Sequence, residues 1–347
     1  MKAPGIRVPR EEGETVRRAL QEAGLLRKDL QVRREGDHLV LPLTEAVPEY
    51  RGFPGVEEDF EPQRHQRETY QEIADVPADL KPLLPSSFDV IGHVLLLKLP
   101  DALAGYERAI AEALMRTNKS VRTVAVDRGV GGELRVRRLE VVAGEPETET
   151  IHTEHGMRLL VDPGAVYFSP RLSTERQRVA AQVKPGEVVV DLFAGAGPFA
   201  ILLARMAEPA KVHAIDLNPE AYVYLEENIR RNRLEGRVEG HLADAREWAR
   251  THPGIADRVI MNLPHTANDF LEDALRVLKP TGGVLHYHTI EAQERLPVHL
   301  ARLAGRARAV GFTLRVLAQR EVRTYSPQEA HFAVDLEARP LVGPENG

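Results

Sequence analysis

The sequence predicts an α/β fold whose C-terminal domain is a doubly wound, mostly parallel sheet of seven strands. The strongest indication is a β-branched run at 188–190 that leads into Asp191, a small-residue loop with Gly195 and Gly197, and then a helix-like run. From there to residue 336, strand-like and helix-like segments alternate, which is typical of a parallel sheet with helices on both faces. The 347-residue chain has no cysteine, which excludes a disulfide framework and a cysteine-based zinc or iron–sulfur site.

Residues 1–70 are expected to form a small α/β appendage followed by an acidic linker. Pro9 opens a helix with apolar residues at helical spacing, and Gly24 marks its end. A unit this small should have little core of its own and be a mobile appendage. The other elements expected here are strands at 30–32 and 38–43, joined by the hairpin signal Glu35-Gly36-Asp37, and a linker at 48–85 with one short helix near 67–73.

Residues 71–168 are expected to form an α+β middle domain. The apolar run at 89–98 predicts one strand, in which Gly92 marks a bulge or a close backbone approach. The elements that follow are an amphipathic helix at 103–115, strands at 121–126 and 134–142, and an antiparallel pair at 150–155 and 157–161 around Gly156.

Charge is distributed unevenly along the chain. The formal net charge is −6, which by itself argues against a nucleic-acid partner. Residues 116–138, however, hold seven Lys or Arg residues against two acidic ones, whereas residues 51–80 hold three basic and eight acidic residues. Because local charge decides where a polyanion docks, the strand face with Arg135, Arg137 and Arg138 is a candidate nucleic-acid surface. The alternative interpretation is a solvated edge strand protected by charge.

Residues 169–347 are expected to form the third domain, which carries the doubly wound sheet. We expect its last two strands to form a hairpin. The expected strands are 188–192, 212–215, 238–242, 259–261, 283–289, 312–320 and 332–336, and the expected helices are 199–206, 219–231, 245–250, 270–278 and 297–309.

Two acidic residues end strands of this sheet. Asp216 ends the second strand, nineteen positions after Gly197, where an acid is placed to accept hydrogen bonds from ribose hydroxyls. Asp244, at the end of the third strand, is positioned to accept from an adenine amino group or to cap the helix at 245–250, and both roles can hold together. The loop departs from the G-x-G-x-x-G dinucleotide fingerprint, since Pro198 follows Gly197.

Residues 166–178 connect the middle domain to the sheet. Ser173 or Thr174 is expected as the N-cap of a helix that has Glu175 in its first turn. The Glu175 carboxylate is placed either to complement the helix dipole or to face the cleft beside the first strand of the sheet.

Asp191 at a strand end, followed by two spaced glycines, resembles the first motif of class I S-adenosylmethionine-dependent methyltransferases. In that class the Asp region and the glycine loop face the amino-acid part of the cofactor, and the acid of the second strand holds the ribose. Members that act on nitrogens of bases place Asn or Asp, followed by Pro, after the fourth strand. Asn262-Leu263-Pro264 stands there in this chain, at the edge where such sheets bind ligands.

Five motifs narrow the resemblance to a family. The chain contains, in order, VYFSPRLSTER, DLFAGAGPF, IDLNPEA, NLP and GGVLHYHT. Their order and spacing resemble the archaeal and eukaryotic tRNA (guanine-N1)-methyltransferases that modify the purine at position 37, 3′ of the anticodon. The similarity continues upstream through LPSSFDVIGHVLLLKLP and RVRRLEVVAGE. The N-terminal unit looks like that family's small tRNA-binding appendage, so the resemblance covers nearly the whole chain.

The resemblance implies which residues form the site. S-adenosylmethionine is the implied cofactor, and no metal is implied. Arg137 or Arg138 could instead occupy the position of the catalytic arginine that is assigned to Arg135. The implied residues are Arg135, Glu175 and Asn262 for catalysis; Asp191, Phe193, Gly195, Gly197, Asp216, Leu217, Asp244, Ala245 and Asn262 for the cofactor; and Tyr167, Arg171 and Pro264 for the substrate.

The implied residue types fit a physical mechanism. Guanine N1 carries a proton at neutral pH, so its methylation needs a base, and Glu175 would accept that proton. Arg135 would stabilise the negative charge that develops on O6. The base must leave the anticodon-loop stack, and Tyr167 would offset part of that cost by stacking on it. The alternative for Tyr167 is a core tyrosine at a domain seam.

Three other functions share some of these features. Enzymes of the wybutosine pathway resemble the same family but transfer the aminocarboxypropyl group of the cofactor, or methylate a tricyclic guanine at carbon. The triplet at 262–264 favours nitrogen methylation over them. A non-catalytic RNA-binding protein is expected to have lost Asp191, Asp216 or Asn262, and a small-molecule methyltransferase has no need for the long N-terminal extension with its basic strand face.

The expected partner is tRNA, contacted at its anticodon loop and body by a monomeric protein. A cytoplasmic location is expected, because the N-terminus lacks the apolar run of a signal peptide. No membrane association is expected, since the most apolar stretch, 90–99, is too short to span a bilayer.

Overall fold

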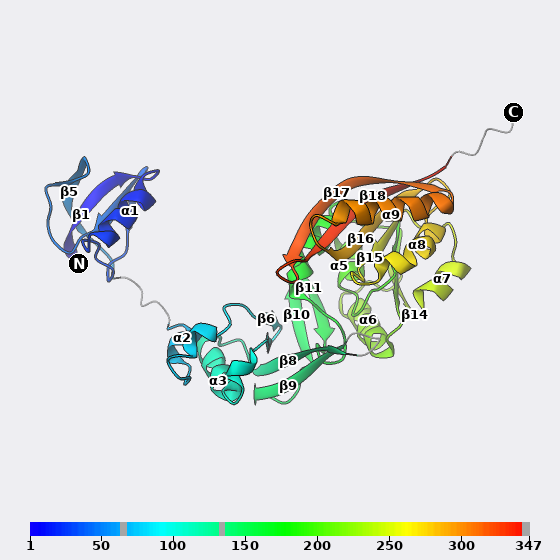
Figure 1. The fold of residues 1–347 in the computed structure, drawn as a ribbon, viewed down its shortest axis with the longest axis horizontal. Coiled ribbons are helices and arrows are strands. Elements are labelled where there is room, and N and C mark those ends of the chain that lie inside the picture. The colour runs from blue at the N-terminus through cyan, green and yellow to red at the C-terminus, as the bar shows by residue number, and fades with distance from the viewer. Residues whose placement is uncertain (63–67, 132–135, 342–347) are drawn as a thin grey trace. The chain divides into compact units, whose positions relative to one another are not determined.

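A computed structural model describes residues 1–62, 68–131 and 136–341 of the chain. The chain divides into two units, Met1–Thr69 and Tyr70–Gly347, which Figure 1 draws in blue and in cyan to red. Within the described ranges, no helix combines the length and the apolar character that a membrane crossing requires.

The first unit is a five-stranded antiparallel sheet with one helix. The strand order is β2-β3-β1-β5-β4, and every neighbouring pair is antiparallel. The elements are β1 (Lys2–Pro9), α1 (Gly13–Glu22), β2 (Arg33–Glu35), β3 (His38–Pro42), β4 (Glu49–Tyr50) and β5 (Phe53–Asp59).

This unit has a core of its own. Val16 and Leu20 lie one turn apart on α1 and are buried in one cluster with Ile6, Val8 and Leu41 of the sheet. Burying a side chain of this size contributes roughly 1.5–3 kcal/mol. The expectation that the appendage has little core is therefore wrong.

Three strands of the first unit, β1, β4 and β5, are absent from the sequence prediction. β5 runs through the acidic stretch that was predicted to be a linker. The prediction missed this strand because Pro54 and Gly55 are residues that rarely occur inside strands. Gly55 is required there, since a Cβ at this position would lie 1.8 Å from the carbonyl oxygen of Val47. The hairpin around Gly36 is confirmed, although its first strand begins at Arg33, three residues later than expected.

The second unit begins with small sheets and short helices. A four-stranded sheet has the order β6-β7-β8-β9, in which only β7 and β8 are parallel, and β10 and β11 form a separate hairpin. The elements are α2 (Tyr70–Ile73), η1 (Lys81–Leu83), β6 (Asp89–Ile91), β7 (Val94–Leu97), η2 (Asp101–Leu103), α3 (Glu107–Thr117), β8 (Thr123–Gly131), β9 (Val136–Gly144), β10 (Thr150–Glu154) and β11 (Met157–Val161).

The single strand expected at 89–98 is two strands joined by a tight turn. β6 and β7 pair antiparallel with Ile91 opposite Val94. Gly92 lies in the turn with φ +55°, and a Cβ there would lie 2.0 Å from Thr150 Oγ1. Gly92 is thus a close-approach point, as predicted, but the chain reverses at it instead of continuing.

The connection into the large sheet is a 3₁₀ turn, η3 (Pro170–Leu172), followed directly by helix α4 (Ser173–Ala180). Neither Ser173 nor Thr174 caps the helix: the N-cap position is Leu172, and no side chain caps it. Ser173 Oγ lies 2.9 Å from His155 Nε2 instead. The predicted side-chain cap is therefore wrong, because a tertiary partner takes the hydroxyl.

The seven-stranded sheet of the second unit has the order β14-β13-β12-β15-β16-β18-β17. Its first five strands are parallel, and β18 is antiparallel to both of its neighbours. The doubly wound fold and the terminal hairpin are confirmed. The elements are β12 (Val188–Asp191), α5 (Pro198–Met206), β13 (Lys211–Asp216), α6 (Pro219–Arg231), β14 (Val238–Leu242), α7 (Ala245–Thr251), β15 (Arg258–Met261), η4 (Ala267–Phe270), α8 (Leu271–Val277), β16 (Gly283–Glu291), α9 (Leu296–Ala309), β17 (Phe312–Thr324) and β18 (Ala330–Pro340).

Adjacent residues of the central strand β12 are buried in different cores. Val189 packs in a cluster with Leu225 of α6 and with most of α5, whereas Val190 packs in a cluster with Trp248 of α7 and Leu271 of α8. Successive strand side chains point to opposite faces, so helices cover both faces of the sheet (Figure 1). The carboxyl ends of the parallel strands remain as the open edge.

Candidate active site

The glycine loop after β12 is fixed to the end of β13. Gly195 has φ +55°, and Gly197, the N-cap of α5, has φ +85°. The backbone N–H of Gly195 donates to Asp216 Oδ2 at 2.6 Å, and the N–H of Asn218 donates to Asp216 Oδ1 at 2.8 Å. Burial raises the pKa of Asp216, although these backbone donors oppose the shift. The loop and the acid of the second strand are therefore one rigid element.

A pocket of about 800 Å³ opens at the carboxyl ends of the parallel strands. It is lined by residues that follow β12 to β15, by β8 and β9, and by the end of β17. Most of the site residues expected from the sequence meet here, although they come from segments far apart in the chain. Those that line it are Tyr167, Arg171, Phe193, Gly195, Asp216, Leu217, Asp244, Ala245, Asn262 and Pro264.

One end of the pocket, called here the aromatic end, is lined by two phenylalanine rings with a carboxylate beside them. The rings of Phe193 and Phe270 meet edge to face at 4.9 Å, and the guanidinium of Arg246 lies 4.0 Å from the Phe270 ring centroid. Asp244 accepts from the backbone N–H of Arg246 at 2.7 Å, so its predicted role as a helix cap is confirmed. Its second oxygen lies 3.8 Å from Arg246 Nη1. Aromatic rings beside a carboxylate suit a purine ring whose amino group donates to that carboxylate.

Asp191 and Gly197, both expected to bind the cofactor, are not among the residues that line the pocket. Asp191 is 1 % exposed and accepts from the N–H of Phe193 at 3.3 Å. Burial raises the pKa of Asp191 to about 7, with the charge of Asp216 adding to the rise and the Phe193 bond opposing it. Asp191 and Gly197 therefore stabilise the conformation of the loop without lining the pocket.

The other end of the pocket is built on Arg137, an arginine whose side chain is only 9 % exposed. Arg137 donates to Asp127 Oδ2 at 2.8 Å and to the carbonyl oxygen of Phe168 at 3.5 Å, and it lies 3.7 Å from Asp89 Oδ2. Arg171 donates to the other oxygen of Asp89 at 2.6 Å. Because its partners are themselves held in place, Arg137 presents a fixed guanidinium to the pocket.

The structure bears on the choice among three neighbouring arginines. Arg135, the predicted catalytic one, lies outside the described residues. Arg137 lines the pocket, whereas Arg138 donates to the carbonyl oxygen of Arg128 at 3.3 Å and is not among the lining residues.

Glu175, the predicted base, is not among the lining residues either. Its carboxylate is buried and accepts from Arg178 at 2.7 and 2.9 Å, with Arg320 Nε 3.6 Å away. Its neighbour Arg176 does line the pocket and is held by Glu154 through two hydrogen bonds of 2.7 and 2.5 Å.

The triplet after β15 has a fixed backbone. The carbonyl oxygen of Leu263 accepts from the N–H groups of Thr266 and Ala267, and that of Pro264 accepts from Ile290 N–H at 3.0 Å. Asn262 therefore lies at the strand end, at the start of a turn whose backbone is fixed by hydrogen bonds.

Among the pocket residues that the sequence prediction did not name are Arg246, Phe270, Arg323 and Tyr325. Arg246 and Phe270 follow the two predicted site segments at 244–245 and 262–264, so proximity in sequence was an available signal. Arg323 and Tyr325 come from the end of β17 and the turn after it, and Tyr325 meets the His265 ring at 5.3 Å. No signal in the sequence indicated them, because their position depends on the antiparallel pairing of β17 with β18.

A Rossmann-like sheet with a glycine loop, an acid at the end of the second strand and a pocket at the carboxyl ends of its parallel strands defines the class of nucleotide-cofactor-binding α/β domains. Three family models match the chain: the TRM5/TYW2 methyltransferase domain at residues 150–312, the TYW2 N-terminal domain at 71–148 and the tRNA methyltransferase 5 N-terminal domain at 5–51. The chain belongs to the TRM5/TYW2 methyltransferase family.

Curated relatives from archaea span the chain. It is 42 % identical over 332 residues to the tRNA (guanine(37)-N(1))-methyltransferase Trm5b of Pyrococcus abyssi, covering 95 % of this chain and 97 % of the relative. It is 33 % identical over 265 residues to the tRNA(Phe) (4-demethylwyosine(37)-C(7)) aminocarboxypropyltransferase of Pyrococcus horikoshii, covering 76 % of this chain and 92 % of the relative.

Solved structures give the same relationship. Trm5b from Pyrococcus abyssi superposes with a TM-score of 0.76 at 41 % identity, covering 97 % of this chain and 99 % of that one. A complex of aTrm5 and tRNALeu gives 0.69 at 33 % identity over 96 % and 99 %. Methanocaldococcus jannaschii Trm5 in complex with adenosine gives 0.64 at 32 % identity over 98 % and 100 %.

Proposed function

We propose that the chain transfers a methyl group from S-adenosylmethionine to N1 of guanosine 37 in tRNA. One observation carries the proposal: a single pocket joins the aromatic end with Asp244, the triplet at 262–264 and the guanidinium of Arg137. The names of the relatives and the tRNA and adenosine complexes of similar structures support it.

The residues at the aromatic end of the pocket and in the glycine loop fit the cofactor. Asp216 would accept from the ribose hydroxyls, and Asp244 would accept from the adenine amino group beside Phe193 and Phe270. The glycine loop would face the amino-acid part of the cofactor with little side-chain bulk. When bound, S-adenosylmethionine supplies the electrophilic methyl group. Asn262 would hold the target nitrogen in line with it, and positioning of this kind supplies much of the rate.

Glu175 is proposed as the base that takes the proton from guanine N1. Its carboxylate is now engaged by Arg178, so the proposal requires that it exchange this partner for N1–H when the base enters. The proposed partner of O6 is one of two neighbouring arginines, either Arg135 or Arg137. Arg137 has the better supported position, because it already lines the pocket.

The anticodon loop of the tRNA is proposed to enter the pocket. The tRNA phosphates are proposed to contact the basic segment at 116–138 and the N-terminal unit. Tyr167, which is 36 % exposed at the pocket, would stack on the extruded guanine. Phosphate contacts of this kind make affinity fall steeply as salt rises. The protein is proposed to act as a monomer, because the extra unit supplies RNA-binding surface that a partner chain would otherwise provide.

One alternative has an observation in its favour. The relative that transfers an aminocarboxypropyl group is 33 % identical to this chain, and the model of the TYW2 N-terminal domain matches residues 71–148. The Asn262-Leu263-Pro264 triplet favours methyl transfer to nitrogen, so aminocarboxypropyl transfer to the same tRNA position is the second candidate.

The deciding experiment identifies the product. The full chain is incubated with unmodified tRNA bearing G37 and with methyl-labelled cofactor, and the digested nucleosides are analysed by mass spectrometry. One-methylguanosine that is lost when G37 is replaced by A is expected. A mass gain of an aminocarboxypropyl group on the tRNA would instead establish the alternative, and no product on any tRNA would overturn both.

A further inference from the structure

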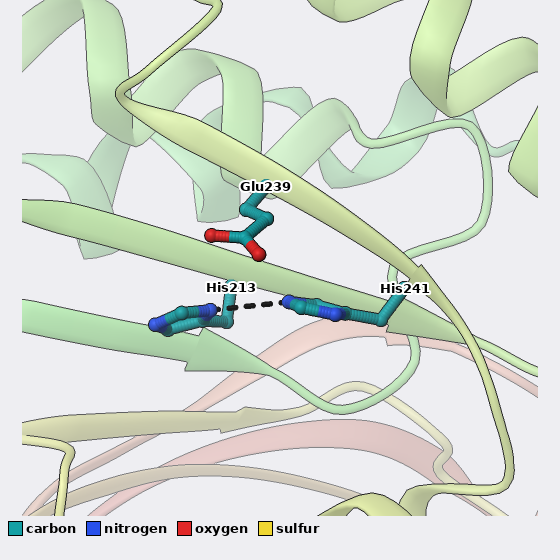
Figure 2. Close-up of side chains that lie close together, drawn as sticks. All are labelled: His213, Glu239 and His241. Atoms are coloured by element: carbon teal, nitrogen blue, oxygen red, sulfur yellow. Dashed lines mark hydrogen bonds between the residues drawn. The ribbon is translucent and has the colours of Figure 1, made fainter.

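Three potential metal ligands gather on one face of the sheet, away from the pocket. His213 lies on β13, and Glu239 and His241 lie two residues apart on β14. The parallel register puts His213 beside Glu239 and Ile215 beside His241. Since side chains alternate along a strand, all three point to the same face, as Figure 2 shows. None of the three lines the pocket described above.

The distances suit a small cation. His213 Nδ1 lies 3.1 Å from His241 Nε2, and one ligand atom from each of the three residues lies within 4.8 Å of the others. Two imidazole nitrogens bound tetrahedrally to zinc at ~2.05 Å are roughly 3.3 Å apart. An ion would therefore replace the bond between the two rings with almost no movement of either.

The surroundings hold both rings in place. Trp248 of α7 packs against His213 and His241, with ring centroids 5.5 and 5.3 Å away, and its own far side is stacked by His252 at 4.2 Å. The two rings are therefore held in place for a metal, which binds the lone pair of an imidazole nitrogen.

We propose that His213, Glu239 and His241 bind one divalent transition-metal ion, with Zn²⁺ as the ion that best suits two imidazoles and a carboxylate. β14 is the edge strand of the sheet, and the bound ion would tie it to β13. The role is structural. β14 leads directly into Asp244, so the ion would also steady the strand end that carries this pocket residue.

A lysine competes for the carboxylate. Lys211 Nζ lies 2.9 Å from Glu239 Oε2, and the Glu239 side chain is about half exposed, at 49 %. Metal binding would exchange this surface ion pair, which stabilises a protein little, for a coordination bond. Removing the lysine should therefore strengthen metal binding. If the three residues form only an ion pair and a hydrogen bond between histidines, no metal should bind, whether or not Lys211 is present.

The test uses the full chain, free of any histidine tag and stripped with EDTA. Zn²⁺ is titrated by calorimetry, and Ni²⁺ is titrated by quenching of Trp248, the only tryptophan in the sequence. We expect one equivalent of Zn²⁺, quenching by Ni²⁺, and a rise of Tm with Zn²⁺. His241→Ala should weaken binding at least about tenfold, since loss of even an outer partner costs that much, and Lys211→Met should tighten it.

His38→Ala is the matched control, because His38 is an exposed histidine on β3 of the other unit. It should bind Zn²⁺ as the unaltered chain does. If His241→Ala does not fold, Glu239→Gln decides, since this half-exposed side chain can be replaced without cost to the core. Two results would overturn the proposal. The first is that the unaltered chain shows no saturable binding of Zn²⁺, and the second is that it binds Zn²⁺ only as tightly as both His241→Ala and Glu239→Gln do.

Discussion

Arg178 holds Glu175 through two hydrogen bonds, from Nη2 to Oε1 at 2.7 Å and from Nε to Oε2 at 2.9 Å. The same guanidinium donates from Nη2 to Asp335 Oδ1 at 2.9 Å and also bonds the other oxygen of Asp335 through Nη1. Asp335 lies on β18 and is bonded by His286 at 2.8 Å. Arg178 thus joins the helix that carries the proposed base to the antiparallel end of the sheet.

Replacing this arginine should strongly destabilise the second unit. Arg178→Gln leaves two buried carboxylates without their charged partner, and breaking a buried ion pair in this way costs about 3–5 kcal/mol. Arg320→Gln is the matched control: Arg320 lies 3.6 Å from the same Glu175 carboxylate but is 36 % exposed, so its loss should cost no more than about 1 kcal/mol. Urea unfolding followed by Trp248 fluorescence measures both, and equal losses would refute the difference in burial as the cause.

Glu175→Gln should abolish most methyl transfer without weakening the cofactor. A general base contributes about 10²- to 10⁴-fold, so kcat should fall by that range. The affinity for S-adenosylhomocysteine, measured by calorimetry, should be unchanged, since Glu175 is not among the lining residues of the pocket. Glu220→Gln, an exposed glutamate on α6, is the control. Full activity of Glu175→Gln would remove this residue from the mechanism.

Arg137 and Arg138 should differ sharply although they are adjacent. Arg137→Lys loses the fixed guanidinium that lines the pocket, so kcat should fall by roughly 10²- to 10³-fold, the range for one donor to a developing oxyanion. Arg138→Lys should change kcat little, because its side chain bonds Arg128 outside the pocket. Single-turnover methylation at saturating tRNA separates this effect from RNA affinity. If both variants keep kcat, Arg135 becomes the remaining candidate of the three arginines.

The sequence was most informative where a local rule decides the structure. The glycines at 195 and 197 and the acid at 216 follow from the chemistry of a strand-loop-helix turn, and the structure places Gly195 and Asp216 in contact. Strand β5 was missed because its Pro54 and Gly55 look like a linker when the partner strand is unknown. Local composition reports turns well, but it does not report which distant strand completes a sheet.

Side-chain direction was the least predictable feature of the site. Glu175 was expected at the cleft, but its carboxylate is bonded to Arg178. Arg178 is in turn held by Asp335, which lies 157 residues away from it in the sequence. The pair His213 and His241 lies 28 residues apart and becomes a pair only through the register of β13 and β14, so no metal site was predicted. Contacts of this kind depend on the assembled fold, and no short spacing in the chain encodes them.

The two loop glycines should tolerate alanine differently. At Gly197 the backbone has φ +85°, and a Cβ would lie 2.5 Å from Leu225 Cδ1 in the core. Gly197→Ala should therefore cost roughly 2–5 kcal/mol of unfolding free energy, from backbone strain and overpacking together. At Gly195 a Cβ would meet only the Tyr167 carbonyl oxygen, at 3.4 Å. Gly195→Ala should cost about 1–2 kcal/mol from its φ alone, and thermal unfolding of the two variants compares them directly.

Glu154 should make the second unit sensitive to acid. Burial alone would raise the pKa of this carboxyl, but hydrogen bonds from His152 and Arg176 lower it to about 2, from an ordinary value of 4.5. A carboxyl with a lowered pKa in the folded state stabilises the protein above its unfolded pKa and loses that contribution as pH falls. Between pH 4.5 and 2 the unaltered chain should therefore lose about 3 kcal/mol more than a Glu154→Gln variant.

The comparison with Glu154→Gln isolates this one group, because other carboxyls titrate in both proteins. Urea unfolding at a series of pH values gives the difference in unfolding free energy, which should be largest above pH 4.5 and shrink towards pH 2. Glu112→Gln, in an exposed pair with Arg108 on α3, should give a difference that is small at every pH, since water screens that pair. A Glu154→Gln difference that does not change with pH would mean that Arg176 stabilises the folded chain equally well without a charged partner.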